Sequence, residues 1–193
     1  MPRTGAGFGL LCPRAVLPAV GDCLSLPPMR LALYQPDIAP NAGTLMRLAA
    51  CLGLGVDLIE PCGFIFGDSR FRRAGMDYLD RVELRRHVSW EAYLESRRAA
   101  AVGRLVLLTT RADLAYTEAT FAPEDTLMVG RESAGVPEAV HAAADLRVAI
   151  PMRPGLRSVN VAVAASMVLG EGLRQTGLFP PLTPPPLTQG IEA

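Results

Sequence analysis

Lysine is absent from this chain of 193 residues, so all 19 of its strongly basic residues are arginines. The acidic residues also number 19, and this zero balance argues against a general binder of polyanions. A genome whose base composition favours arginine codons explains the missing lysines. The arginines nonetheless crowd into one central region, and guanidinium groups suit bidentate contacts to phosphate. They are Arg70, Arg72, Arg73, Arg81, Arg85, Arg86, Arg97, Arg98 and Arg104.

Cysteine and histidine are scarce. The four cysteines form no CxxC pair, and only two histidines could join them as ligands, so neither a zinc site nor a disulfide framework is indicated. We therefore expect reduced thiols, no bound metal and a cytoplasmic location. No stretch approaches the roughly 18 apolar residues of a membrane span, so we expect no membrane association.

Several common catalytic motifs are also missing. No GxGxxG follows the first predicted strand, and there is no Walker loop, GxSxG elbow or HExxH helix. The pair Gly53 and Gly55 instead is typical of the end of a helix. A dinucleotide-binding fold, a hydrolase and a nucleotidase are therefore all unsupported.

The length suits one domain with a proper core. Prolines interrupt residues 1–28, and we interpret this stretch as a disordered extension. Alternatively, translation starts at Met29 and the stretch is an artefact of start-codon choice. The folded domain is expected to span 29–179. The Pro-rich stretch 180–193 reads as a disordered tail.

Between these ends, predicted strands alternate with predicted helices. Such alternation is typical of an α/β fold with a mostly parallel sheet and helices on both faces. The expected strands are 30–34, 56–60, 104–109, 126–129 and 146–150, and the expected helices are 42–52, 89–101, 137–143 and 158–176.

The first predicted helix is amphipathic, with Asn41 as a plausible N-cap. Its apolar stripe leaves Arg47 on another face. The stripe consists of Leu45, Leu48, Ala49 and Leu52.

The last predicted helix, 158–176, has no polar face over about three turns. Such a helix must be covered on all sides. Two explanations are equally weighted: it lies at or near the interface of a homodimer, or it is a central core helix.

Three loops between predicted strands and helices stand at places where α/β proteins commonly seat ligands. With two further stretches they resemble the SPOUT superfamily and, more narrowly, its tRNA 2′-O-methyltransferases that modify the wobble cytidine or uridine. The resemblance covers residues 29–179 in order. Its stretches are 33–47 (LYQPDIAPNAGTLMR), 59–64 (IEPCGF), 72–78 (RRAGMDY), 130–137 (GRESAGVP) and 150–160 (IPMRPGLRSVN).

The resemblance implies a deep trefoil knot in the C-terminal part, a homodimer, and S-adenosylmethionine bound in a bent form among the knot loops. Sequence reasoning alone would have excluded a knot. The cofactor-binding residues implied by the resemblance are Leu108, Thr109, Thr110, Gly130, Glu132, Gly135, Ile150, Met152, Ser158 and Asn160.

These residues also have ordinary structural explanations. Gly130 and Gly135 would let the backbone approach the adenosine closely, or they are turn glycines. Apolar residues such as Leu108 and Met152 would line an adenine slot, or they are simply core. Glu132 would hold its loop by local hydrogen bonds, which we favour, or lie near the cationic sulfonium.

Two polar residues at the start of the last predicted helix also have both a structural and a functional explanation. Ser158 and Asn160 would cap the last helix and contact the cofactor at once.

Arg47 and Asn41 are the expected catalytic residues under the resemblance. Because an arginine is nearly always protonated, we expect Arg47 to bind the target phosphate and lower the pKa of the ribose hydroxyl, with base action a minor alternative. Arg70, Arg72 and Arg73 are expected to bind the RNA backbone. A solvated surface position is the alternative for each arginine.

The expected substrate is the wobble nucleotide 34 of tRNA, with leucine tRNA as the expected species. Two departures from the family pattern weaken this assignment: Arg131 stands where relatives often carry proline, and Gly170 where some carry tyrosine. The alternatives are a related enzyme acting on another tRNA site or on ribosomal RNA, and a noncatalytic dimer that binds cofactor or RNA.

Overall fold

A computed structural model describes residues 29–67, 81–100 and 103–182. Its centre is a six-stranded sheet in the order β3-β2-β1-β5-β4-β6, in which every pair of neighbouring strands is parallel. The strands are β1 (Arg30–Tyr34), β2 (Gly55–Ile59), β3 (Leu84–His87), β4 (Leu105–Leu108), β5 (Thr126–Val129) and β6 (Leu146–Val148).

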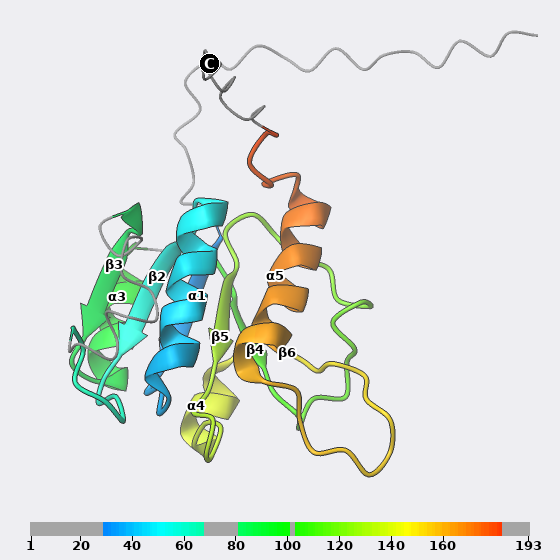
Figure 1. Cartoon of the computed structure of the whole chain (residues 1–193), viewed down its shortest axis with the longest axis horizontal. Helices are drawn as coiled ribbons and strands as arrows, with labels where there is room; N and C mark the ends of the chain where they lie inside the picture. Colours follow the sequence, from blue (N-terminus) through cyan, green and yellow to red (C-terminus); the bar gives the residue numbers. More distant parts are fainter. Residues whose placement is uncertain (1–28, 68–80, 101–102, 183–193) are drawn as a thin grey trace, which may run out of the picture.

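Helices cover both faces of this sheet (Figure 1). On one face, α1 and α5 pack together over side chains such as Leu31 and Leu127. On the other, Tyr93 of α3 and Val140 of α4 pack over Ala32 and its neighbours. The helices are α1 (Ala39–Leu52), α3 (Trp90–Ala100), α4 (Glu138–Ala143) and α5 (Val161–Thr176). The predicted α/β class with a parallel sheet is confirmed.

Strand β3 was not predicted from the sequence. Its residues Leu84-Arg85-Arg86-His87 show no apolar alternation, because β3 is an edge strand whose two arginines are exposed. A buried ion pair helps to hold this edge: Asp57 of β2 accepts a hydrogen bond of 2.7 Å from Arg30 Nε and lies 2.8 Å from His87 Nε2. The contacts that define β3 are thus long-range and polar.

Helix α1 begins three residues earlier than predicted. Ile38 is its N-cap and makes no side-chain cap bond, while a proline occupies the first turn, where its missing N–H costs nothing. The prediction that Asn41 caps this helix is therefore wrong, since Asn41 lies inside the first turn. The predicted apolar stripe is buried at Leu45 and Ala49, and Arg47 is exposed as expected.

Helix α5 begins at Val161, three residues later than predicted. Of the two predicted cap residues, Asn160 is the N-cap, and its side-chain oxygen accepts hydrogen bonds from the amides of Ala162 and Val163, whereas Ser158 lies two residues before the cap. One face of α5 is buried, but Val163 is 52% exposed and Met167 40% exposed. Within this chain α5 is thus not a central core helix, and an apolar face stays uncovered.

Two expectations about the chain's chemistry concern its cysteines and metals. Burial, with a contribution from the charge of Glu60, raises the pKa of the Cys62 thiol to about 11, which keeps it protonated at neutral pH. Cys51 and Cys62 are both free thiols. Over the described ranges there is no group of three potential metal ligands from His, Cys, Asp and Glu, and none of the helices there is long and apolar enough to cross a bilayer.

The predicted disordered ends fall largely outside the structure. Residues 1–28 and 183–193 lie beyond the described ranges, as does the predicted RNA-binding cluster Arg70, Arg72 and Arg73.

Candidate functional site

A cavity of about 440 Å³ lies at the carboxyl ends of β4 and β5, beside the N-terminus of α5. This is where parallel α/β sheets usually bind ligands, and the volume is typical of a ligand pocket. All of the predicted cofactor-binding residues border it, and so does Asn41. They are Leu108, Thr109, Thr110, Gly130, Glu132, Gly135, Ile150, Met152, Ser158 and Asn160.

The loop after β5 closes on itself beside this cavity. The Arg131 amide donates to the Gly135 carbonyl at 3.0 Å, and the Gly135 amide donates back at 2.8 Å. A Cβ on Gly130 would lie 2.7 Å from the carbonyl carbon of Gly135, and Gly135 itself has a φ of +65°. Both glycines are therefore required by the closure of the loop, in addition to bordering the cavity.

Asp37 joins this loop to the loop between β1 and α1. Its carboxylate accepts hydrogen bonds from the hydroxyl and the amide of Ser133 and from the guanidinium of Arg131, with N–O distances of 3.0–3.2 Å. In return, Glu132 accepts a hydrogen bond of 2.8 Å from the Asp37 amide. We call this reciprocal arrangement of Asp37 and residues 131–133 the Asp37 clasp.

The Glu132 carboxylate is also the first member of a chain of hydrogen-bonded side chains. Its other oxygen accepts a hydrogen bond of 3.1 Å from Asn41 Nδ2, and Asn41 Oδ1 accepts one of 3.1 Å from Asn160 Nδ2. Glu132 thus braces a loop, as we favoured, but the partner lies on the β1–α1 side of the cavity rather than within its own loop. The three predicted loops meet through these side chains.

The clasp should make stability depend on pH in a defined direction. The Ser133 hydroxyl, together with Arg131 and the Ser133 amide, holds the pKa of Asp37 below its ordinary value, although burial opposes the shift. A lowered pKa in the folded state stabilises the protein above the unfolded pKa of about 4, and that stability is lost as the pH falls through the folded pKa. We expect Asp37→Asn to lower Tm by about 3 °C at pH 7.

This difference in Tm should shrink as the pH falls below about 4, because the unfolded carboxyl binds protons first and the folded carboxyl becomes neutral only at a lower pH. Thermal unfolding followed by circular dichroism from pH 3 to pH 8 measures it. Asp113→Asn, which removes one exposed negative charge from the segment after β4, is the control. A Tm difference that stays constant down to pH 3 would contradict the role of the charged clasp.

Arg47 is not among the residues that border the cavity. It lies on the exposed face of α1, six positions beyond Asn41 and therefore nearly two turns further along the helix. The structure brings together the predicted cofactor residues and Asn41, but it leaves Arg47 facing outward. A ligand that contacts both the cavity residues and Arg47 must therefore extend from the cavity onto the outer surface of the protein.

Sequence reasoning missed Asp37, and although the resemblance placed Arg131 and Ser133 in the cofactor loop 130–135, it did not foresee their contacts to Asp37. Asp37 lies three residues after the end of the central strand β1. Loops that follow the carboxyl ends of strands in parallel sheets frequently hold ligand-binding residues. The partners of Asp37 are 94 to 96 positions away in the chain, so no local pattern connects them. Arg157, another cavity residue, was also missed.

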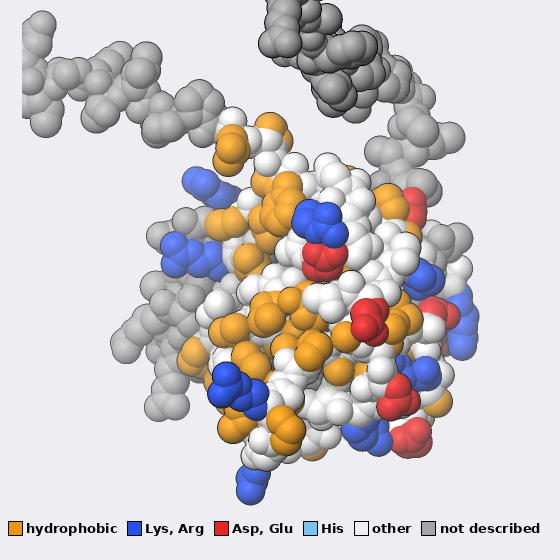
Figure 2. All heavy atoms as spheres, turned by 90° about the vertical axis from the view of Figure 1, so that its right-hand side faces the viewer, with side chains coloured by type: hydrophobic (Ala, Val, Ile, Leu, Met, Phe, Trp, Pro, Cys, Tyr) orange, Lys and Arg blue, Asp and Glu red, His pale blue; other side chains and the backbone are white. Residues whose placement is uncertain are grey.

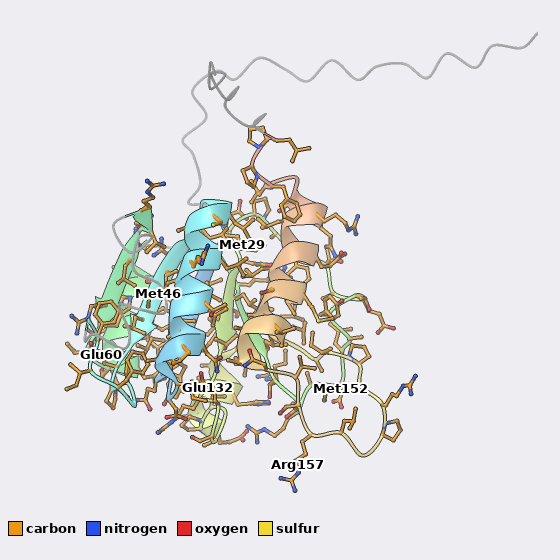
Figure 3. The ribbon with its side chains drawn as sticks, in the orientation of Figure 1. Met29, Met46, Glu60, Glu132, Met152 and Arg157 are labelled. Carbon is orange, nitrogen blue, oxygen red and sulfur yellow. The ribbon has the colours of Figure 1, made fainter. Side chains whose placement is uncertain are left out.

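The composition of the cavity wall fits S-adenosylmethionine. Leu107, Leu108 and Ile150 offer an apolar surface for a purine, and the glycines of the closed loop leave room for backbone contacts to it. Glu132 is the only acid among the described wall residues, which suits a cationic group nearby. In Figure 3, Glu132 lies beside the lower end of α1, and Met152 lies on the loop that leads towards Arg157.

The family model for the SpoU rRNA Methylase family matches residues 28–170. The chain belongs to this SpoU family. Its match includes the β1–α1 loop, the closed loop after β5, the 150–160 segment and most of α5, which together form the cavity.

Individual SpoU relatives agree with this assignment. A tRNA (cytidine(34)-2'-O)-methyltransferase of Beijerinckia indica is 62% identical over 151 residues, covering 76% of this chain and 91% of the relative. A solved structure described as giving insights into the 2-OH methylation of C/U34 on tRNA is 41% identical, covers 77% of this chain and 97% of its own, and has a TM-score of 0.71.

A third relative carries a cofactor. The SpoU methyltransferase AviRb from Streptomyces viridochromogenes, solved in complex with AdoMet, is 27% identical to this chain. The alignment covers 78% of this chain and 61% of AviRb, with a TM-score of 0.69.

Proposed function

We propose that this protein transfers a methyl group from S-adenosylmethionine to the ribose 2′-hydroxyl of the wobble nucleotide 34 of tRNA, and that it does so in the cytoplasm. One observation carries the proposal: residues from three distant loops meet at one cavity through the chain Glu132–Asn41–Asn160. The names of the relatives at 62% and 41% identity support the choice of substrate. Leucine tRNA is the first species to test.

The chain's own residues would supply binding and orientation. When bound, the cofactor supplies an activated methyl group. Asn41, fixed on both sides by Glu132 and Asn160, presents an oriented amide at the edge of the cavity where the ribose must arrive. Arg47, on the exposed face of α1 outside the cavity, binds the phosphate of the target nucleotide, and its positive charge there lowers the pKa of the ribose hydroxyl. Holding two reactants in line accounts for much of the rate enhancement.

We propose that the SpoU fold of this chain contains the deep trefoil knot of its superfamily. Segments 109–125 and 149–160 run beside each other near the cavity (Figure 1). The Ala149 amide donates to Leu114 at 2.9 Å, and the Tyr116 amide donates to Ala149 at 3.0 Å. This contact between two long connections supports a chain crossing there. The folded domain is proposed to span 29–179.

A homodimer belongs to the same proposal. Figure 2 views the molecule from the side of α5 and the segments 109–125 and 149–160, and hydrophobic side chains gather over the middle of this face. Val163 and Met167 contribute the exposed apolar face of α5, and Val159 precedes it at 38% exposure. A second copy would cover this surface.

Met167→Glu tests the dimer. A carboxylate introduced into an apolar interface is costly to bury, so we expect the dimer dissociation constant to rise by at least about 100-fold. Sedimentation velocity measures the change, with Val88→Glu, at an exposed apolar residue after β3, as the control. A dimer of unchanged stability in Met167→Glu would exclude α5 from the interface.

The function itself is tested by the transfer of labelled methyl from S-adenosylmethionine to total tRNA from a strain that lacks the corresponding gene. Nucleoside mapping should place the label on the wobble ribose. Label at another tRNA site or on ribosomal RNA would move the substrate within the family. Cofactor binding without any transfer would favour the noncatalytic alternative.

A further inference from the structure

The segment that follows β2 exposes one apolar side chain to solvent, while the residues on either side of it are packed against the core. Ile65 is 77% exposed, whereas its neighbours Phe64 and Phe66 are partly buried and pack against the main core. The two phenylalanines therefore fix the backbone on either side of Ile65. An isoleucine held outward in this way offers a fixed apolar contact surface.

Arg86 of β3 adds a cationic plane to this surface. Its guanidinium carbon lies 5.0 Å from the centre of the Phe66 ring, within the range of a cation–π contact. Arg86 Nε also donates a hydrogen bond of 3.0 Å to Glu60, and this pair limits its rotation. The Arg86 side chain remains 52% exposed, so the guanidinium is oriented but still accessible.

The segment that carries this surface packs directly against the β1–α1 loop of the candidate site. The Gly63 amide donates to the Pro36 carbonyl at 2.9 Å, and a Cβ on Gly63 would lie 2.9 Å from the Asp37 Cα, so only glycine allows this approach. Ile65 is two residues beyond Gly63 and thus within about 7 Å of it along the chain. Asp37 in turn belongs to the clasp beside the cavity.

This position lies along the same edge of the sheet as the cavity. In Figure 3, Glu60, at the end of β2, and Glu132, at the cavity, both lie towards the lower end of the molecule. A strand of RNA that lies along this edge with one nucleotide in the cavity would bring its neighbouring nucleotides towards Ile65.

We propose that Ile65, Phe66 and Arg86 form a stacking platform for the base of an unpaired nucleotide adjacent to the methylated one. This inference rests on the proposed function and names a base contact for the same RNA. Bases of single-stranded nucleic acids stack on aromatic side chains and on arginine guanidinium groups with little dependence on sequence, and Ile65 adds an apolar contact beside them. A protein partner fits less well, since each side of a stable protein interface buries about 800 Å², which is more than these three side chains offer.

Ile65→Ser tests the platform in the full chain. We expect KM for an anticodon stem-loop RNA to rise about fivefold or more, because a stacking contact is lost, while kcat and the affinity for S-adenosylhomocysteine stay unchanged. Val88→Ser is the matched control, because Val88 is a β-branched residue that is 78% exposed. Ile65→Phe keeps an exposed apolar side chain and supplies a flat ring, so it should bind the RNA at least as well as wild type.

An abasic RNA identifies the contact as one to a base. Removing the base next to the target should raise KM for the wild-type protein but have little further effect on Ile65→Ser. Additive effects of the two changes, or equal effects of Ile65→Ser and Val88→Ser, would overturn the proposal. A shift from dimer to monomer in Ile65→Ser would overturn it in favour of a protein interface.

Failure of the proposed function would look different. In that case the wild-type protein would methylate no tRNA, whatever its neighbouring bases. The platform would then be judged by binding of a single-stranded oligonucleotide, which Ile65→Ser should weaken and Val88→Ser should not.

Discussion

Replacing Arg47 with alanine is expected to lower kcat for methyl transfer by about 100- to 1000-fold, the usual cost of removing one group that stabilises developing charge on oxygen. Arg47 lies on the exposed face of α1 and does not border the cavity. The affinity for S-adenosylhomocysteine, measured by calorimetry, should therefore remain within about twofold of wild type, since no contact to that ligand is removed.

Two further variants make this result specific. Arg47→Lys keeps the charge but loses the planar, bidentate geometry, so it should recover only part of the activity. Arg98→Ala removes an exposed arginine from α3, on the opposite face of the sheet, and should leave kcat unchanged. Wild-type turnover in Arg47→Ala would remove Arg47 from the mechanism, while equal losses in both alanine variants would indicate a general effect of charge.

Gly130→Ala is expected to weaken cofactor binding by about 5- to 150-fold. The added methyl group would lie 2.7 Å and 2.9 Å from the carbonyl carbon and oxygen of Gly135, and 2.9 Å from Val136 Cγ1. Because two of these atoms belong to the backbone, the loop after β5 must open to admit it. Overpacking of this kind costs about 1–3 kcal/mol, which corresponds to a factor of about 5 to 150 in an equilibrium constant.

Calorimetric titration with S-adenosylhomocysteine measures the effect of Gly130→Ala on binding. Gly170→Ala is the control, because a Cβ at that helical position meets nothing within 4 Å in this chain, and alanine favours helix formation. We expect that variant to bind normally. Unchanged affinity in Gly130→Ala would show that the loop tolerates opening and that its closure does not shape the cavity.

The elements that bury an apolar face were predictable from the sequence. β1 and β5 were predicted with the observed boundaries, because each is a short, mostly apolar run whose residues are buried. The apolar stripe of α1 identified the face that packs on the sheet. The edge strand β3 was not predictable, since its pairing with β2 depends on Arg30, Asp57 and His87 rather than on a hydrophobic pattern.

The candidate site was predictable only in part. Family resemblance named residues in three loops, and the fold gathers them around one cavity. The hydrogen bonds among them could not be foreseen, because Asp37 and Asn41 meet Glu132 and Ser133 across more than 90 positions. Asn41 illustrates the difference: its type and position suggested a local cap, whereas its side chain serves a long-range contact.

The packing of the residue before β1 against α5 has a consequence for the synthesis of the protein on the ribosome. Met29, just before β1, lies against Gly172 near the end of α5, where an added Cβ would be 2.8 Å from the methionine methyl carbon. About 130 residues separate β1 from the first turn of α5. At roughly 5–20 residues per second, the ribosome needs about 6 to 26 seconds to deliver them. Throughout that interval the nascent chain carries an apolar sheet face without its final helix.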